Sequence, residues 1–226
     1  MSDPVAPRPR TQVRTFKPRR RALSERRQAM LAEFGPRYLL DDAGDPLDLA
    51  AVFGRTAPVV IEIGIGGGEA LVTTMSAEAD VDHIGIDVHT PGVAGVIATA
   101  AEAGIENVRL VHGDALVFLD RLAPGTIAGI RLFFPDPWPK NRQRHRRIVN
   151  ATNVARFVGV LKQGAYLHIV TDVVAYAAAI AAVCAAEPRL AGGEIARPTS
   201  RPETRHERKG RTAGRRITDL WYTRRP

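Results

Sequence analysis

Cysteine is nearly absent from this sequence, in which Cys184 is the one cysteine among 226 residues. A lone cysteine cannot form an internal disulfide, so the chain is not a disulfide-stabilised secreted module, and we expect it to work in a reducing compartment. The longest apolar run, residues 173–186, has 14 residues and is too short for a membrane-spanning helix. The first residues also lack the apolar core of a secretory signal. We therefore expect a cytoplasmic protein with no membrane segment.

Lysine is scarce as well, because 28 of the 32 basic residues are arginine. The net charge of +8 is unevenly distributed: residues 1–37 carry +7, residues 38–187 carry −6 and residues 188–226 carry +7. Five cations of the acidic middle lie in one run, residues 140–147. A compositional bias explains arginine in place of lysine, but it does not explain the clustering. Clustered cations are typical of a polyanionic partner, and we expect a nucleic acid.

From residue 58 onward, apolar strand-like runs alternate with helix-like segments. We expect strands at residues 59–64, 83–88, 107–112, 127–134, 165–171, 192–196 and 217–223, and helices at 24–34 (capped by Ser24), 69–78, 92–103, 115–122, 148–161 and 176–186. This order predicts an α/β fold, a doubly wound, mostly parallel seven-stranded sheet whose last strand is antiparallel. We expect a basic N-terminal extension over residues 1–37, partly disordered, and one domain over 38–226 with basic loops at 140–147 and 197–216.

Glycines cluster directly after the first predicted strand, in residues 64–68. Glycine allows a sharp turn and a close approach of the backbone to a ligand, so Gly64 and Gly66 are candidate cofactor-binding residues. The dinucleotide fingerprint G-x-G-x-x-G requires a glycine at the position of Glu69, which disfavours a nicotinamide enzyme.

Acidic residues stand at the ends of three successive predicted strands. Asp87 is placed to accept hydrogen bonds from a ribose diol, Asp114 to reach an adenine edge, and Glu62 to meet an ammonium group. A helix N-cap is the competing interpretation of Asp114. Together the three acids suit a positively charged nucleoside, and the constellation resembles that of class I S-adenosylmethionine methyltransferases.

The most specific segment follows the fourth predicted strand, at residues 134–140 (FPDPWPK). Prolines on both sides of Asp136 fix the backbone and hold this carboxylate at the crevice. Trp138 offers a flat ring on which a base could stack, and the competing interpretation is a proline-rich turn whose tryptophan belongs to the core. The segment runs directly into the basic block 140–147, which favours a substrate-binding role.

This segment resembles the signature of the bacterial tRNA (guanine-46-N7)-methyltransferase family. Further similar segments occur in the same order over about nine-tenths of the chain, at residues 14–16, 35–38, 62–64, 85–89, 171–172, 197–199, 204–210 and 219–220. The resemblance implies an S-adenosylmethionine-dependent enzyme that methylates N7 of guanine 46 in the variable loop of tRNA, without a metal. Whether it is a monomer or a homodimer stays open.

The resemblance also implies roles for individual residues. Cofactor binding would fall to Glu62, Gly64, Gly66, Asp87, Asp114 and Asp136, and catalysis to Asp136. The target nucleotide would be held by Lys140, Asp172, Thr204, Arg205, His206 and Glu207, and the RNA by Arg142, Gln143, Arg144, His145, Arg146 and Arg147. Two positions depart from the family pattern, since Asp87 stands where glutamate is usual and His206 where phenylalanine is common.

Two other interpretations compete with this one. Residues 134–138 faintly resemble the Asn/Asp-Pro-Pro-aromatic motif of enzymes that methylate exocyclic base nitrogens, but Trp138 stands where a second proline is expected. A non-catalytic RNA-binding scaffold is the third possibility, although such a protein would be expected to lose the cofactor acids.

Overall fold

The computed structural model describes residues 15–16 and 23–226. The expected disorder of residues 1–20 therefore lies almost entirely outside the described residues. The helices are α1 (Glu25–Tyr38), α2 (Leu49–Phe53), α3 (Glu69–Ala77), α4 (Thr90–Glu102), α5 (Ala115–Leu119), α6 (Ala151–Val160), α7 (Val174–Ala185) and α8 (Arg205–Thr212), with a 3-10 helix η1 (Asn141–Arg146). The strands are β1 (Leu39–Leu40), β2 (Val59–Ile63), β3 (Asp82–Asp87), β4 (Val108–His112), β5 (Ile127–Phe133), β6 (Leu161–Thr171), β7 (Leu190–Ile195) and β8 (Thr218–Arg224).

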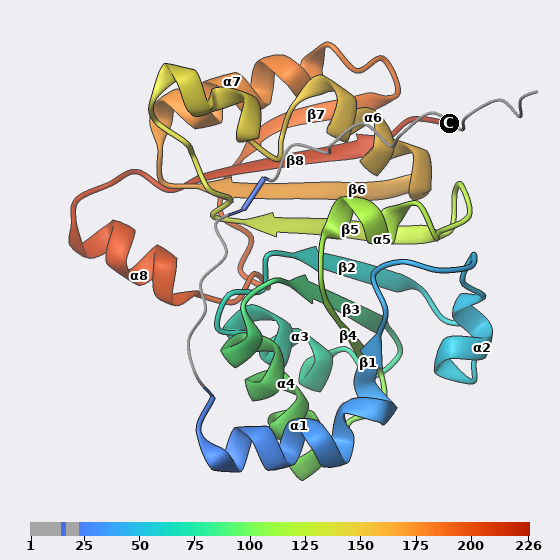
Figure 1. Ribbon diagram of the computed structural model, residues 1–226. Coiled ribbons are helices and arrows are strands. Elements are labelled where there is room, and N and C mark those ends of the chain that lie inside the picture. The colour runs from blue at the N-terminus through green and yellow to red at the C-terminus, as the bar shows by residue number, and fades with distance from the viewer. Residues whose placement is uncertain (1–14, 17–22) are drawn as a thin grey trace, which may run out of the picture.

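One mixed sheet, in the order β1-β4-β3-β2-β5-β6-β8-β7, forms the centre of the fold (Figure 1). The pairings from β1 to β6 are parallel, and β8 is antiparallel to both of its neighbours, as predicted for the last strand. All seven predicted strands are present. The eighth, β1, has two residues and is too short to produce an apolar pattern of its own.

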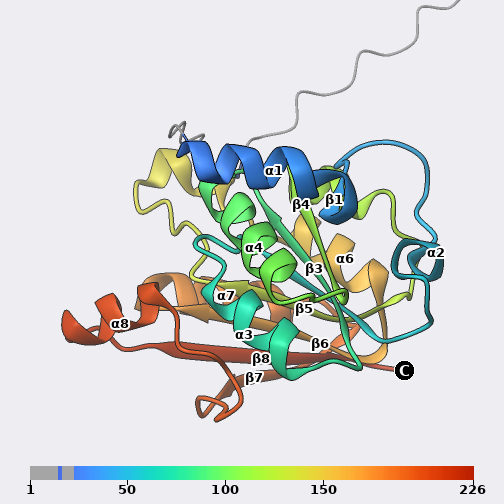
Figure 2. The same cartoon turned by 90° about the horizontal axis from the view of Figure 1, so that it is seen from below.

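Helices cover both faces of the sheet, which makes the fold doubly wound. Helices α5, α6 and α7 pack on one face, and the other face is covered by α1, α3 and α4, which Figure 2 shows together on one side. The strands β2 and β3 are buried on both faces, which explains the near-continuous run of valine and isoleucine in β2.

The structure differs from the prediction in four respects. Helix α1 extends four residues past the expected end, packs on α4 and carries the buried Tyr38, so the boundary placed at residue 37 falls inside a packed helix. Ser24 occupies its N-cap position but its side chain makes no capping hydrogen bond. The stretch 197–216, predicted as a loop, contains α8, and the run 140–147 contains η1.

Chain order reverses between β2 and β5, because β3 and β4 follow on one side of β2 whereas β5 and β6 lie on the other. Ligands of open α/β sheets bind in the crevice that such a reversal leaves at the carboxyl ends of the strands. No helix among the described residues has the length and apolar character needed to cross a membrane.

Candidate active site

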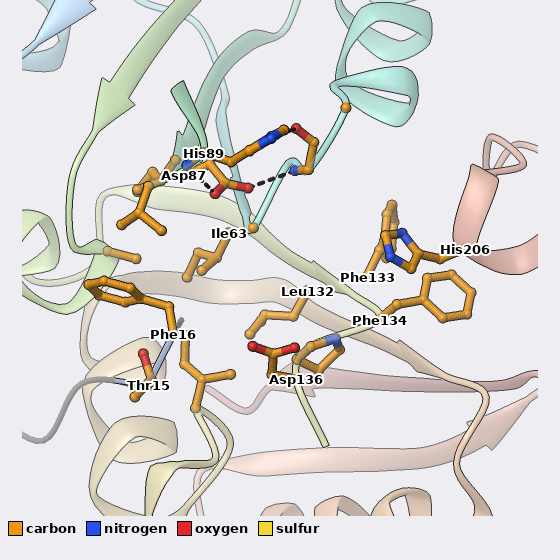
Figure 3. Close-up of a pocket in the computed structure, with 18 of the residues that line it drawn as sticks. Thr15, Phe16, Ile63, Asp87, His89, Leu132, Phe133, Phe134, Asp136 and His206 are labelled. Carbon is orange, nitrogen blue, oxygen red and sulfur yellow. Dashed lines mark hydrogen bonds between the residues drawn. The ribbon is translucent and has the colours of Figure 1, made fainter. Parts of the chain in front are cut away.

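A pocket of about 480 Å³ lies at this reversal, at the carboxyl ends of β2, β3, β4 and β5 (Figure 3). Figure 3 shows Asp87 and Asp136 on opposite sides of it, with Ile63 and Leu132 between them. Of the residues predicted to bind the cofactor, the pocket is lined by Gly64, Gly66, Asp87, Asp114 and Asp136. Residues separated by more than 70 positions in the sequence thus meet in one cavity.

The glycine loop forms the floor of the pocket where β2 ends. Gly64 and Gly66 have φ angles of 81° and 58°, which side chains of L-residues rarely adopt. A Cβ at either position would meet no atom within 4 Å. The backbone there is therefore exposed on the pocket side, where a ligand can approach it closely.

Asp87 fixes the shape of this loop. Its Oδ2 accepts a hydrogen bond from the Gly66 amide at 2.7 Å, and its Oδ1 accepts one from the His89 amide at 2.8 Å. Each carboxylate oxygen has a second lone pair available for a ligand. Asp87 therefore has a structural role in addition to the ligand contact predicted for it.

Asp114 is an N-cap, the competing interpretation raised by its sequence position. Its Oδ1 accepts a hydrogen bond from the Leu116 amide at 2.9 Å at the start of α5. Its own amide donates to Asp42 Oδ2, also at 2.9 Å. Capping uses one carboxylate oxygen, so the N-cap role and a contact with a ligand in the pocket are compatible.

Glu62 differs from the other acids because it is buried and does not line the pocket. Its residue is 3% exposed, and its Oε2 has no hydrogen-bond partner among the described residues. Burial raises the pKa of Glu62 to about 8; Arg131 opposes the rise and Asp87 adds to it. An unpaired buried carboxyl close to the glycine loop is a site that a cationic group would satisfy.

The segment after β5 is conformationally strained. Phe134 and Trp138 have φ angles of 55° and 40°, values that are unusual outside glycine. Between them, Asp136 is exposed to solvent at the edge of the pocket. The turn therefore places an accessible carboxylate where a substrate would enter.

Trp138 does not offer a face to a base, and that expectation is wrong. The residue is 3% exposed, its Nε1 donates to the Thr15 carbonyl at 3.1 Å, and the Arg146 guanidinium lies 3.8 Å from the ring centroid. Trp138 instead connects the N-terminal segment and the basic block to the turn.

The residues predicted to hold the nucleotide divide into two groups. Arg205 and His206 line the pocket, and the His206 ring stacks on Phe134 with centroids 6.0 Å apart. The others, Lys140, Asp172, Thr204 and Glu207, lie outside its lining. Asp172 Oδ2 is 3.1 Å from Arg215 Nε.

Thr204 and Glu207 have their polar groups engaged within the protein. Thr204 Oγ1 accepts from the Glu207 amide and caps α8, while the Glu207 carboxylate is fully buried against Arg197 and Arg201. Burial alone would raise the pKa of Glu207, but the hydrogen bonds and charges of these two arginines outweigh it and lower that pKa. The buried Glu207 carboxylate therefore does not face the pocket, whereas the Thr204 hydroxyl keeps its proton as a donor.

The basic run 142–147 also divides by exposure. Arg142, Arg144 and His145 are exposed, whereas Gln143, Arg146 and Arg147 are partly buried. Arg147 Nε donates to the Pro137 carbonyl at 2.8 Å, and Arg146 covers Trp138. The exposed members are the ones that are available to phosphates, and Arg146 and Arg147 support the turn that carries Asp136.

Several lining residues were missed by the sequence analysis. Phe16 and Thr15 reach the pocket from the N-terminal segment, and Lys209 reaches it from α8. No local pattern in the sequence assigns segment 14–16 to a site whose next lining residue is Ile63. The described residues contain no group of three or more His, Cys, Asp or Glu side chains arranged to hold a metal ion.

Comparison with known proteins gives consistent results. Residues 56–220 match a family described as "Putative methyltransferase". The tRNA (guanine-N(7)-)-methyltransferase of Thiobacillus denitrificans is 40% identical over 96% of this chain and 97% of its own length. The enzyme of the same name from Ralstonia nicotianae is 41% identical over 94% of this chain and 87% of its own.

Solved structures with a similar fold are also methyltransferases. The antibiotic-resistance methyltransferase Kmr superposes with a TM-score of 0.56 at 16% identity, over 79% of this chain and 92% of its own. The 16S rRNA methyltransferase KamB superposes with a TM-score of 0.55 at 14% identity, over 81% and 96%. At such low identity these likenesses establish the class I methyltransferase fold alone.

Proposed function

This chain belongs to the tRNA (guanine-N7)-methyltransferase family, and we propose that it transfers a methyl group to N7 of guanine 46 in the variable loop of tRNA. The observation that carries the proposal is the placement of Asp136, an exposed carboxylate held by a strained turn, across the pocket from the glycine loop. The alternatives, an exocyclic-nitrogen methyltransferase and a non-catalytic scaffold, become outcomes of the test below.

S-adenosylmethionine is the cofactor of this family, and the residues of the pocket fit it. The open backbone at Gly64 and Gly66 and the carboxylates of Asp87 and Asp114 suit a nucleoside. The unpaired carboxyl of Glu62 suits a cationic group. The carboxylates of Asp87 and Asp114 supply negative charge and hydrogen-bond acceptors, as a positively charged ligand requires.

The chemistry places few demands on proton transfer. When bound, S-adenosylmethionine supplies an electrophilic methyl group and leaves as a neutral thioether. Guanine N7 carries an in-plane lone pair, so no proton has to be removed before attack, and the protein contributes mainly by placing N7 in line with the methyl group. The base becomes cationic, and the Asp136 carboxylate would stabilise that charge and accept hydrogen bonds from the guanine edge.

The distribution of charge supports an RNA substrate. Exposed Arg142 and Arg144 flank the turn, and α8 carries three arginines and a lysine on the other side of the pocket. Phosphates bound by these two groups would bring the variable loop of a tRNA to the pocket.

The test is methylation of a tRNA transcript with S-adenosylmethionine, followed by mapping of the methyl group by nuclease digestion and mass spectrometry. We expect one methyl group on N7 of guanine 46 and none in a transcript with adenine at that position. Asp136→Asn is the matched inactive variant. A methyl group on an exocyclic nitrogen would support the first alternative, and tRNA binding without any transfer would support the scaffold.

A further inference from the structure

Helix α8 stands apart from both layers of the fold (Figures 1 and 2). Of its eight residues, Glu207 and Gly210 are buried. Apolar packing therefore contributes little to its position, and an isolated helix of this length is not stable in water. Even so, Arg205, His206 and Lys209 of α8 line the pocket. Another interaction must hold the helix in place.

Buried ion pairs supply that interaction. Glu207 Oε2 accepts from Arg201 Nη1 at 2.7 Å, and Glu207 Oε1 accepts from Arg201 Nη2 at 2.9 Å and from Arg197 Nε at 2.7 Å. The side chains of Glu207 and Arg201 are each 1% exposed. A bidentate pair shielded from water has a defined geometry and is not screened by salt.

Arg201 extends this contact to the sheet. Its Nε lies 2.8 Å from Oδ1 of Asp219 on β8, and the same oxygen lies 2.9 Å from Nε2 of His168 on β6. One planar guanidinium thus joins a carboxylate of the protruding helix to a carboxylate of the central sheet. Lysine cannot make the bidentate contact with Glu207 and also pair with Asp219 from one position.

The first turn of α8 has a second attachment. The Arg205 amide, in the first turn of the helix, donates to Glu69 Oε2 at 2.6 Å, and Glu69 begins α3 next to the glycine loop. Arg201 and Glu69 thus both hold the first turn of α8, and Arg205, His206 and Lys209 of this helix line the pocket. Its orientation then determines where Arg205 and His206 lie relative to the reacting atoms.

We infer that Arg201 is a positioning residue for methyl transfer, and that Glu207 acts through Arg201 instead of touching the guanine. Both Glu207 oxygens already accept from cationic donors, and this fully buried residue lies outside the lining of the pocket, so its carboxylate does not face a guanine bound there. The pair instead holds α8 in the orientation that faces Arg205 and His206 toward the substrate. The catalytic part of this inference rests on the proposed function.

The first experiment measures the helix directly, without tRNA or cofactor. Hydrogen–deuterium exchange of the peptide covering residues 205–212 is compared in the wild type, Arg201→Met and Arg211→Met. We expect exchange of this peptide to be faster by about tenfold or more in Arg201→Met and unchanged in Arg211→Met, because Arg211 is an exposed cation of the same helix. Exchange in α4 should be the same in all three, which verifies the fold. Unchanged protection of α8 in Arg201→Met would overturn the inference.

The second experiment is a double-mutant cycle on the reaction at saturating tRNA. Arg201→Met and Glu207→Gln should each lower kcat by about 10- to 100-fold. The cofactor Kd of each variant should stay within about twofold of the wild-type value. The kcat of the double variant should be no lower than that of the less active single variant. Losses that multiply would show that Glu207 contacts the substrate independently and would refute its assignment.

A conservative variant keeps the inference testable if Arg201→Met does not fold. Arg201→Lys retains the charge and one contact, so its kcat should lie between the kcat of Arg201→Met and that of the wild type. If Arg201→Met is insoluble, Glu207→Gln provides the lower value for this comparison. Wild-type activity in Arg201→Lys would contradict the need for a bidentate bridge. If the wild type itself methylates no tRNA, the proposed function fails, whereas the exchange experiment still decides how α8 is held.

Discussion

The buried carboxyl of Glu62 predicts an unusual dependence of stability on pH. Glu62 has an ordinary pKa of 4.5 when exposed in the unfolded chain, and burial raises it to about 8 in the folded protein. The folded state therefore holds a proton that the unfolded state has released throughout the interval between these values. A group with this difference lowers the free energy of unfolding by about 1.36 kcal/mol for each pH unit of increase.

His83 opposes this effect over part of the interval. Burial lowers the pKa of His83 from 6.5 to about 4, and Arg131 adds to the lowering, so this imidazole makes the protein more stable as the pH rises from 4 to 6.5. Below pH 6.5 the two groups nearly cancel. From pH 6.5 to 8, Glu62 still lowers the free energy of unfolding and His83 no longer raises it. The decrease due to Glu62 amounts to about 2 kcal/mol over 1.5 pH units.

The substitution that isolates the effect is Glu62→Gln, which keeps the size of the side chain and cannot ionise. Urea unfolding without cofactor is measured for both proteins at pH 6.5 and pH 8. We expect the stability difference, variant minus wild type, to rise by about 2 kcal/mol between the two pH values. Glu33→Gln, on the exposed surface of α1, is the matched control. Parallel pH profiles for Glu62→Gln and the wild type would refute the assignment of a protonated, buried Glu62.

Three further predictions concern the site. Asp136→Asn should lower kcat by about 100-fold or more, because the carboxylate faces the developing positive charge. Stability against urea should be unchanged, because the side chain is exposed. A kcat near the wild-type value would contradict the role of Asp136. Gly66→Ala should lower the free energy of unfolding by about 1 kcal/mol, because alanine is strained at the φ of 58°. The added methyl group enters the open side of the loop, so calorimetry should show cofactor binding weaker by about tenfold. Tight binding of the cofactor by the variant would argue that no ligand approaches the backbone there. The affinity for tRNA should fall steeply as the salt concentration rises. Arg142→Ala and Arg144→Ala should each reduce the slope of log K against log salt by about 0.7 to 0.9. An affinity that does not change with salt would exclude phosphate contacts at these residues.

Strand positions were predictable because the parallel strands are buried on both faces. The apolar run of β2 and the two isoleucines of β3 result directly from that burial, and glycines and acids mark where the strands end. The same reasoning placed Gly64, Gly66, Asp87 and Asp114 at one edge of the sheet, where the structure places them around a pocket.

Helix α8 was not predictable in the same way. Its sequence, RHERKGRT, contains no apolar residue and therefore no helical stripe, so residues 197–216 resemble a loop. The helix is held by Arg201, Glu207 and Asp219, whose pairing depends on β8 lying beside β6. Such a pairing has no counterpart in any local window of the sequence.

The sequence by itself determined the fold class, the order of the strands along the chain and the chemical types gathered at their ends, because these properties depend on local periodicity and composition. Tertiary structure alone decided which face each side chain occupies: Glu62 is buried and unpaired, Trp138 is covered by Arg146, Glu207 is paired with Arg201, and Phe16 reaches the pocket. The physical reason is that burial and ion pairing depend on residues distant in the sequence, which come together only when the sheet has assembled.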